Sequence, residues 1–214
     1  MIHLYAFAHG LRNLPQRTGV AGEELQVESF DGVDAVVGRI DAPVAESVES
    51  AVAHGLVVEA LLDSADAVLP ARFGQPFADD TALTNATAPR LAELRARLAA
   101  VHGCVELSVR MSTPETERRA PVDGTSYLRE LAAATVARDS NIAELHGVLE
   151  THSVESRVDP LTRGSALFRA AYLVRRDDVD VFARLVDRLA EQLPEASIVC
   201  TGPWTPSSFA QAAA

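Results

Sequence analysis

The chain has 214 residues, and 48% of them are hydrophobic, which is enough for one large or two small domains with buried cores. Its formal net charge is −11 at pH 7, and its basic residues are arginines, with no lysine. Nucleic acids and anionic lipid surfaces attract basic proteins, so this chain is not expected to bind either of them.

The first half of the chain is predicted to form three strands, a helix, a fourth strand and a second helix. Asp31-Gly32 lies between two apolar runs and is a strong hairpin signal, because glycine accepts a positive φ. The stretch 10–22 contains Pro15 and Gly19 and is predicted to be a loop. The expected strands cover residues 2–8, 25–30, 33–40 and 67–73, and the expected helices run from Pro43 to Leu62 and from Asp79 or Asp80 to about His102.

The second half shows the strand and helix order of a ferredoxin-like unit, βαββαβ. We expect strands at 104–111, 153–158, 166–175 and 196–201, with helices at 125–150 and 178–192. Phe182, Leu185, Val186 and Leu189 fall on one helix face, which suits packing on a sheet. The first half fits the same unit with its first helix replaced by the loop 10–22. The sequence therefore predicts an α+β protein with two ferredoxin-like domains, residues 1–101 and 102–214, the first modified and a helix at 83–100 bridging them.

Motifs for catalysis are missing from the sequence. It has no glycine-rich phosphate loop, zinc-protease motif, nucleophile elbow or acidic calcium loop. Its six histidines share no metal-ligand spacing. His54 lies on an apolar helix face without a patterned acidic or cysteine partner, so we interpret it as a core histidine. We predict no catalytic residue, no cofactor and no metal site.

Two irregular segments, 68–79 and 200–209, concentrate aromatic residues in a chain that is only 5% aromatic. This pattern favours docking over chemistry. Arg72 is predicted to satisfy backbone carbonyls or to pair with a carboxylate such as Asp79 or Asp80, with contact to a partner protein as the alternative. Phe73 and Phe77 favour the core over an interface. Trp204 is predicted to be largely buried against the chain itself, and otherwise to await a partner.

These segments also carry a resemblance to a known family. The most specific matches are Leu69-Pro70-Ala71-Arg72-Phe73-Gly74, Phe77-Ala78-Asp79 and Thr201-Gly202-Pro203-Trp204-Thr205-Pro206, and more general matches run from Ile2 onward through the whole chain. With these motifs the chain resembles the gas vesicle accessory proteins of the F/L type. The family pattern has an aromatic residue where this chain has Ser208, so we expect Phe209 and the alanine-rich end to be less ordered.

The resemblance implies a protein without enzymatic activity that takes part in gas vesicle assembly, possesses the two-domain fold and acts in the cytoplasm or at the vesicle. Its implied partners are the very hydrophobic shell protein and other gas vesicle accessory proteins. The residues assigned by this route to partner binding or to a structural motif are Arg72, Phe73, Gly74, Phe77 and Trp204.

The fold alone leaves two other functions open. Tandem ferredoxin-like units occur in haem and oxidative enzymes of the dimeric α+β-barrel type, in which His54 or His152 could be an axial ligand. The same topology serves amino-acid-binding regulatory modules.

The two cysteines, Cys104 and Cys200, have no CxxC pattern and are not expected to form a disulfide. Because the first and last strands of a ferredoxin-like sheet are neighbours, we expect these cysteines to lie close together in one domain. No secretion signal or apolar membrane span is evident, so we expect the protein to remain inside the cell.

Overall fold

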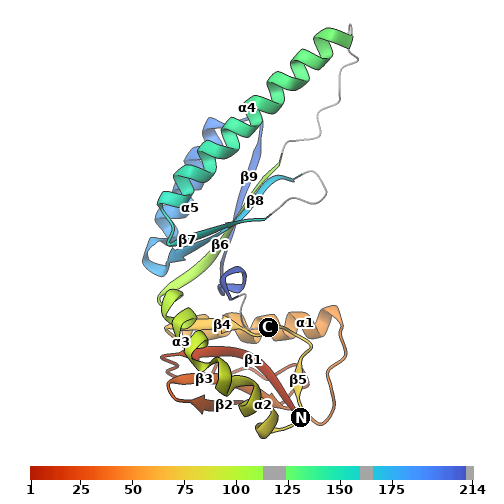
Figure 1. The fold of residues 1–214 in the computed structure, drawn as a ribbon, viewed down its shortest axis with the longest axis vertical. Coiled ribbons are helices and arrows are strands. Elements are labelled where there is room, and N and C mark those ends of the chain that lie inside the picture. The colour runs from red at the N-terminus through yellow and green to blue at the C-terminus, as the bar shows by residue number, and fades with distance from the viewer. Residues whose placement is uncertain (113–123, 160–165, 211–214) are drawn as a thin grey trace. The chain divides into compact units, whose positions relative to one another are not determined.

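The computed structural model describes residues 1–112, 124–159 and 166–210, which form two compact units. Unit 1 contains Met1–Glu106 together with Trp204–Ala214, and unit 2 contains Leu107–Pro203. Each unit has its own sheet and helices (Figure 1). The units differ from the predicted domains at two places, since the division falls inside a strand at Glu106 and the end of the chain groups with unit 1.

Unit 1 is built on a sheet with strand order β2-β3-β1-β4, the ferredoxin-like order predicted from the sequence. A short strand that the sequence pattern missed, β5, pairs with the start of β1. The strands are β1 (Ile2–His9), β2 (Leu25–Phe30), β3 (Val33–Arg39), β4 (Ala67–Pro70) and β5 (Pro76–Phe77). The predicted hairpin is present, with positive φ at Asp31 and Gly32 between β2 and β3.

A loop replaces the first helix of unit 1, as predicted, and it is fixed to the sheet by a buried tyrosine. The Tyr5 hydroxyl donates to Glu23 Oε1 at 2.5 Å and accepts from the Val20 amide at 2.8 Å. Leu11 and Leu14 pack against the core beside them. The loop therefore covers the sheet where a helix would otherwise lie.

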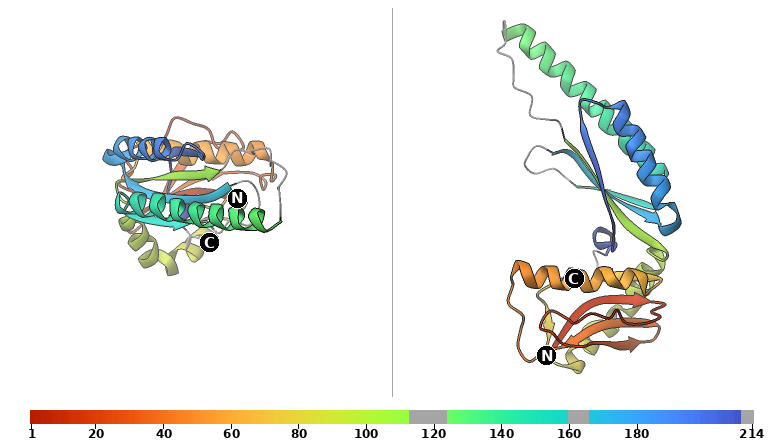
Figure 2. Two further views of the ribbon diagram at one scale, coloured as in Figure 1. Left: turned by 90° about the horizontal axis from the view of Figure 1, so that it is seen from above. Right: turned by 180° about the vertical axis from the view of Figure 1, so that it is seen from behind.

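Helix α1 (Val48–Ala60) lies on one face of the sheet, and α2 (Asp80–Thr87) and α3 (Leu91–Ala100) lie on the other (Figures 1 and 2). The helix predicted from Pro43 begins later, because Ser47 caps it by accepting from the Ser50 amide. Asp79 caps α2 by accepting from the Ala82 amide, as predicted.

The single helix predicted beyond Asp79 is interrupted. A short 3₁₀ turn, η2 (Ala88–Arg90), separates α2 from α3. Pro89 lies in this turn and has no amide hydrogen to continue an α-helix.

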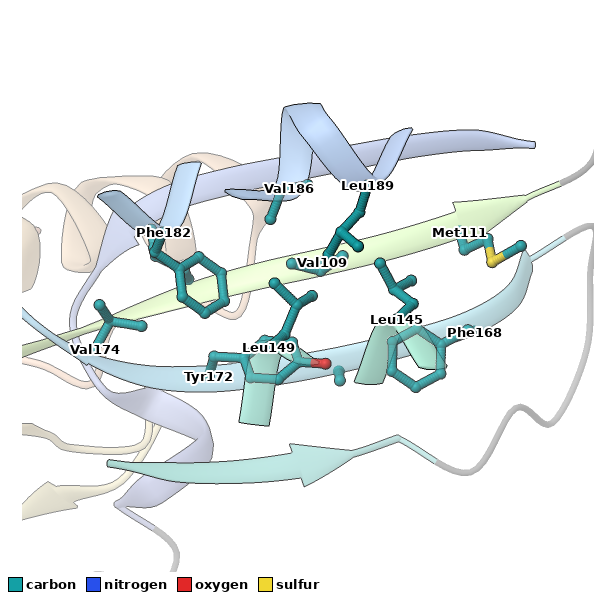
Figure 3. Close-up of a cluster of buried hydrophobic side chains, with 12 residues drawn as sticks. Val109, Met111, Leu145, Leu149, Phe168, Tyr172, Val174, Phe182, Val186 and Leu189 are labelled. Carbon is teal, nitrogen blue, oxygen red and sulfur yellow. The ribbon is translucent and has the colours of Figure 1, made fainter. Parts of the chain in front are cut away.

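Unit 2 has the strand order β7-β8-β6-β9, which confirms the ferredoxin-like topology. Its elements are β6 (Cys104–Ser112), α4 (Gly124–Thr151), β7 (Glu155–Val158), β8 (Ala166–Arg175), α5 (Val179–Gln192) and β9 (Ser197–Trp204), with the turns η3 (Arg176–Asp178) and, after β9, η4 (Ser207–Phe209). Both helices pack on one face of the sheet, where Leu145 and Leu149 from α4 and Phe182 and Leu189 from α5 converge (Figure 3).

The cysteines do not share a unit. Strands β6 and β9 are neighbours, as predicted, but Cys104 groups with unit 1 and Cys200 with unit 2. Neither cysteine takes part in a disulfide. The expectation that they lie in one domain is wrong because β6 crosses the boundary between the units.

Candidate partner-binding site

The segment between β4 and α2, which carries most of the predicted site residues, is fixed at several points. The Ala71 amide donates to the Tyr5 carbonyl at 2.9 Å. Gly74 has a φ of 88°, and a Cβ there would lie 3.0 Å from Glu46 Oε1, so the turn requires glycine. Beyond it, Pro76 and Phe77 pair with β1. The segment is therefore a shaped connection and not a free loop.

Arg72 lies exposed on this segment. Within the described parts of the chain it makes no hydrogen bond or ion pair, because both carboxylates predicted to bind it are engaged elsewhere. Asp79 caps α2, and Asp80 forms an ion pair with Arg39 at 2.8 Å. The predicted pairing of Arg72 is wrong, and contact with a partner protein remains the alternative.

His54 is a buried core histidine, as the sequence indicated. Its Nε2 donates to the Ala71 carbonyl at 3.1 Å, so its Nδ1 accepts from His3 Nε2 at 2.9 Å. The Phe73 ring packs against both imidazoles, with centroids 5.8 Å from His3 and 5.5 Å from His54. Both ring nitrogens of His54 are thus occupied, which leaves neither free to ligate a haem iron.

The environment of this pair disfavours its protonation. Desolvation, and to a smaller extent the charge of His3, lowers the pKa of His54 to about 4. Desolvation also lowers the pKa of His3. A protonated His54 could no longer accept from His3. Neutral imidazoles therefore hold the Ala71 end of the segment in place.

Acidification is expected to destabilise unit 1 as the pH falls from 6.5 towards about 4. In this window the unfolded chain binds a proton at His54 that the folded chain does not, so the free energy of unfolding falls with pH. The loss attributable to His54 should be on the order of 2 kcal/mol. Urea unfolding at pH 7 and pH 5 measures it. His54→Gln should flatten the dependence, whereas the exposed His152→Gln should leave it unchanged; an unaltered dependence in His54→Gln contradicts the assignment.

The end of the chain is anchored in unit 1 by residues other than Trp204. The Trp204 side chain is 41% exposed, so the prediction that it is largely buried is wrong. Instead, Phe209 is buried, and the buried Glu106 accepts from the Ser208 amide and hydroxyl, both at 2.8 Å. Phe209 was expected to be less ordered, but it is packed in the core, and Ser208 contributes hydrogen bonds where an aromatic ring was expected. The rest of the alanine-rich end, residues 211–214, lies outside the described residues.

Two pockets of unit 1 share Ala71 and have opposite charge. The first, which we call the arginine pocket, has a volume of about 200 Å³ and is lined among others by Leu4, Phe7, Arg72, Phe77, Arg90 and Leu94. The second, the tail pocket, has a volume of about 330 Å³ and is lined among others by His54, Gly55, Glu59, Ala71, Glu106 and Trp204. The central and terminal segments singled out in the sequence therefore meet at the tail pocket.

An exposed apolar face of α1 was missed by the sequence analysis. Val48, Val52 and Leu56 are 81%, 55% and 41% exposed and recur every four residues, so they form a continuous line that we call the apolar stripe. The opposite face, with His54, Val57 and Val58, is the buried one. The sequence pattern did not mark this face, because the helix is apolar on all sides.

Within the described residues, no helix combines the length and apolar character needed to cross a membrane. The same residues contain no group of three or more His, Cys, Asp or Glu side chains that could hold a metal ion.

Comparison with known proteins decides the family. The model of the family described as "Gas vesicle synthesis protein GvpL/GvpF" matches residues 1–211. The chain belongs to this family. It is 30% identical over 195 residues to gas vesicle protein F2 of Halobacterium salinarum, covering 89% of this chain and 82% of that one. It is 26% identical over 230 residues to gas vesicle protein F of a Streptomyces species, covering 93% and 94%.

Solved structures confirm the fold of this GvpL/GvpF family member. The crystal structure of GvpF from Anabaena has a TM-score of 0.82 at 18% identity and covers 98% of this chain and 95% of that chain. GvpF from Microcystis aeruginosa has a TM-score of 0.81 at 18% identity, with 98% of each chain covered. The predicted α+β fold and the recognised family are thus both correct.

Proposed function

We propose that this protein is a non-enzymatic assembly protein that binds the hydrophobic shell subunit, and other accessory proteins, during gas vesicle formation. It acts in the cytoplasm and at the growing vesicle. Membership of the GvpL/GvpF family and relatives named as gas vesicle proteins support this role. A very apolar subunit aggregates in water unless a partner covers it, and an acidic chain with a net charge of −11 would keep such a complex dispersed.

The apolar stripe is the observation that carries the proposal. Val48, Val52 and Leu56 expose apolar side chains along one helix at no benefit to the folded chain. Burying them against an apolar helix or strand would contribute roughly 25 cal/mol per Å² of surface removed from water. Trp204 is also exposed and lies in the tail pocket beside Gly55 of the same helix, which extends the surface. Phe73, Gly74 and Phe77 would then support this surface structurally, with Arg72 available for a second contact.

Charging the stripe is expected to abolish capture of the shell protein. Val52→Asp and Leu56→Asp each place a carboxylate on the docking face, where desolvation would cost several kcal/mol. Co-expression of a tagged chain with the shell protein, followed by affinity purification, measures retention. The surface location of these residues predicts that thermal stability changes little, by about 0.5 kcal/mol.

Val136→Asp is the matched control, because Val136 is an exposed valine on a helix of the other unit, 70% accessible. It should retain the shell protein like the unmodified chain. Equal retention by Val52→Asp, Leu56→Asp and Val136→Asp contradicts the stripe as the binding face. No retention by the unmodified chain contradicts shell binding itself.

A further inference from the structure

The tail pocket carries negative charge that no described residue neutralises. Of the described residues that line it, Glu59 and Glu106 are acidic and none is arginine. Glu106 is satisfied by Ser208, whereas the Glu59 carboxylate makes no hydrogen bond or ion pair within the described residues. The unpaired charge of the pocket is therefore the Glu59 carboxylate.

The position of Glu59 adds to the negative electrostatic potential of the tail pocket. It lies in the last turn of α1, where the aligned peptide dipoles place partial negative charge and the Leu61 amide donates to the Val58 and Glu59 carbonyls. That turn has no basic residue. A cation placed there would be attracted by both the carboxylate and the helix end.

Trp204 adds an aromatic wall to the tail pocket. Its indole is 41% exposed, lines the pocket and packs against no other aromatic ring of the described residues. A guanidinium or ammonium group within about 6 Å of an indole face is attracted by the ring's quadrupole. An aromatic wall beside unpaired carboxylate is the arrangement that recognises a basic side chain.

We infer that the tail pocket receives an arginine or lysine side chain of the partner that docks on the apolar stripe. The inference rests on the proposed function, and it names the chemistry of the docked segment. Val52 and Glu59 are seven positions apart on α1, or about 10 Å along the helix axis. The partner's basic residue should therefore lie about 10 Å from the apolar residue that covers Val52. That distance corresponds to about seven residues in a helical partner or about three in an extended one.

Because Trp204 is the chain's only tryptophan, its fluorescence reports directly on the pocket. The full-length protein is titrated with the peptide acetyl-Leu-Arg-Leu-amide and with the same peptide carrying neutral citrulline in place of arginine. We expect a saturable change in Trp204 emission with the arginine peptide that weakens with added salt. The citrulline peptide should bind about tenfold more weakly than the arginine peptide. Equal responses to both peptides, or no saturable response, overturn the inference.

Two variants test the assigned carboxylate. Glu59→Gln removes the charge at constant size and should lower the affinity for the arginine peptide about fivefold to tenfold. Glu49→Gln makes the same change in the first turn of the same helix, remote from the pocket, and should leave binding unchanged. Equal affinities in the two variants would show that general acidity, and not Glu59, attracts the peptide, and would overturn the site.

Two further arms separate the possible failures. If Val52→Asp abolishes shell-protein retention while Glu59→Gln and added salt leave it intact, the proposed function stands and the inference fails. If the peptides discriminate but the shell protein is never retained, the proposed function fails and the pocket stands as a site for another basic partner. If free arginine amide binds as tightly as the tripeptide, the occupant is a small cation and the docking claim is overturned.

Discussion

Replacing Phe209 with alanine is expected to destabilise unit 1 by about 3–5 kcal/mol, the range for removing a buried phenylalanine side chain. Phe209 is 3% exposed, and its carbonyl accepts from Arg97 Nη1 at 3.4 Å, so it fixes the end of the chain to α3. Native-state hydrogen exchange at the amides of β1 and β3 measures the effect. Their exchange should accelerate by roughly two to four orders of magnitude if these strands open by global unfolding of the unit.

Trp204→Ala is the informative comparison for this prediction. Although tryptophan is the larger residue, its side chain is 41% exposed, so its removal should cost only about 1 kcal/mol. This ranking reverses the one suggested by the sequence, in which Trp204 was the anchor. A larger loss from Trp204→Ala than from Phe209→Ala would contradict the burial of the tail described above.

Phe182→Ala should have a similarly large effect in unit 2. The ring is 1% exposed, packs against Tyr172 with centroids 5.3 Å apart, and belongs to the buried cluster in Figure 3. The expected loss is about 3–5 kcal/mol from the transfer of the side chain and the cavity left behind. Hydrogen exchange at the amides of β6 and β8 reports it.

The neighbouring residue offers a control on the same helix. Val181 is 45% exposed, so Val181→Ala should change stability by about 0.5 kcal/mol or less. Similar losses in the two variants would mean that α5 is held by its whole surface and not by the face that contains Phe182.

The succession of strands and helices along the chain was predictable, because apolar runs, the Asp31-Gly32 turn and the 3.6-residue period of α5 are local signals. The ferredoxin-like topology of that succession then gives the strand order in both sheets. Element ends were less predictable. Helix α1 begins after the capping residue Ser47 and not at Pro43. Pro89 interrupts the second helix, although the leucine pattern continues on both sides of it. Each of these helix boundaries depends on a single side chain, whereas the periodicity that predicts a helix is a property of many residues.

The candidate site was predictable only in part. The two segments that meet at the tail pocket stood out by composition, but the partners of individual side chains did not. Arg72 makes no ion pair with any described residue, and Asp80 instead pairs with Arg39, 41 positions away in sequence. The apolar stripe was not singled out, because a helix that is apolar all round does not reveal which face the sheet covers.

The return of the chain to unit 1 has a consequence for biosynthesis. Ser208 closes a hydrogen bond with Glu106 over a separation of 102 positions, and all of unit 2 lies between them. A ribosome therefore completes unit 2 before it supplies Trp204 and the other residues that finish unit 1. The tail pocket cannot form in the growing chain before unit 2 has been made.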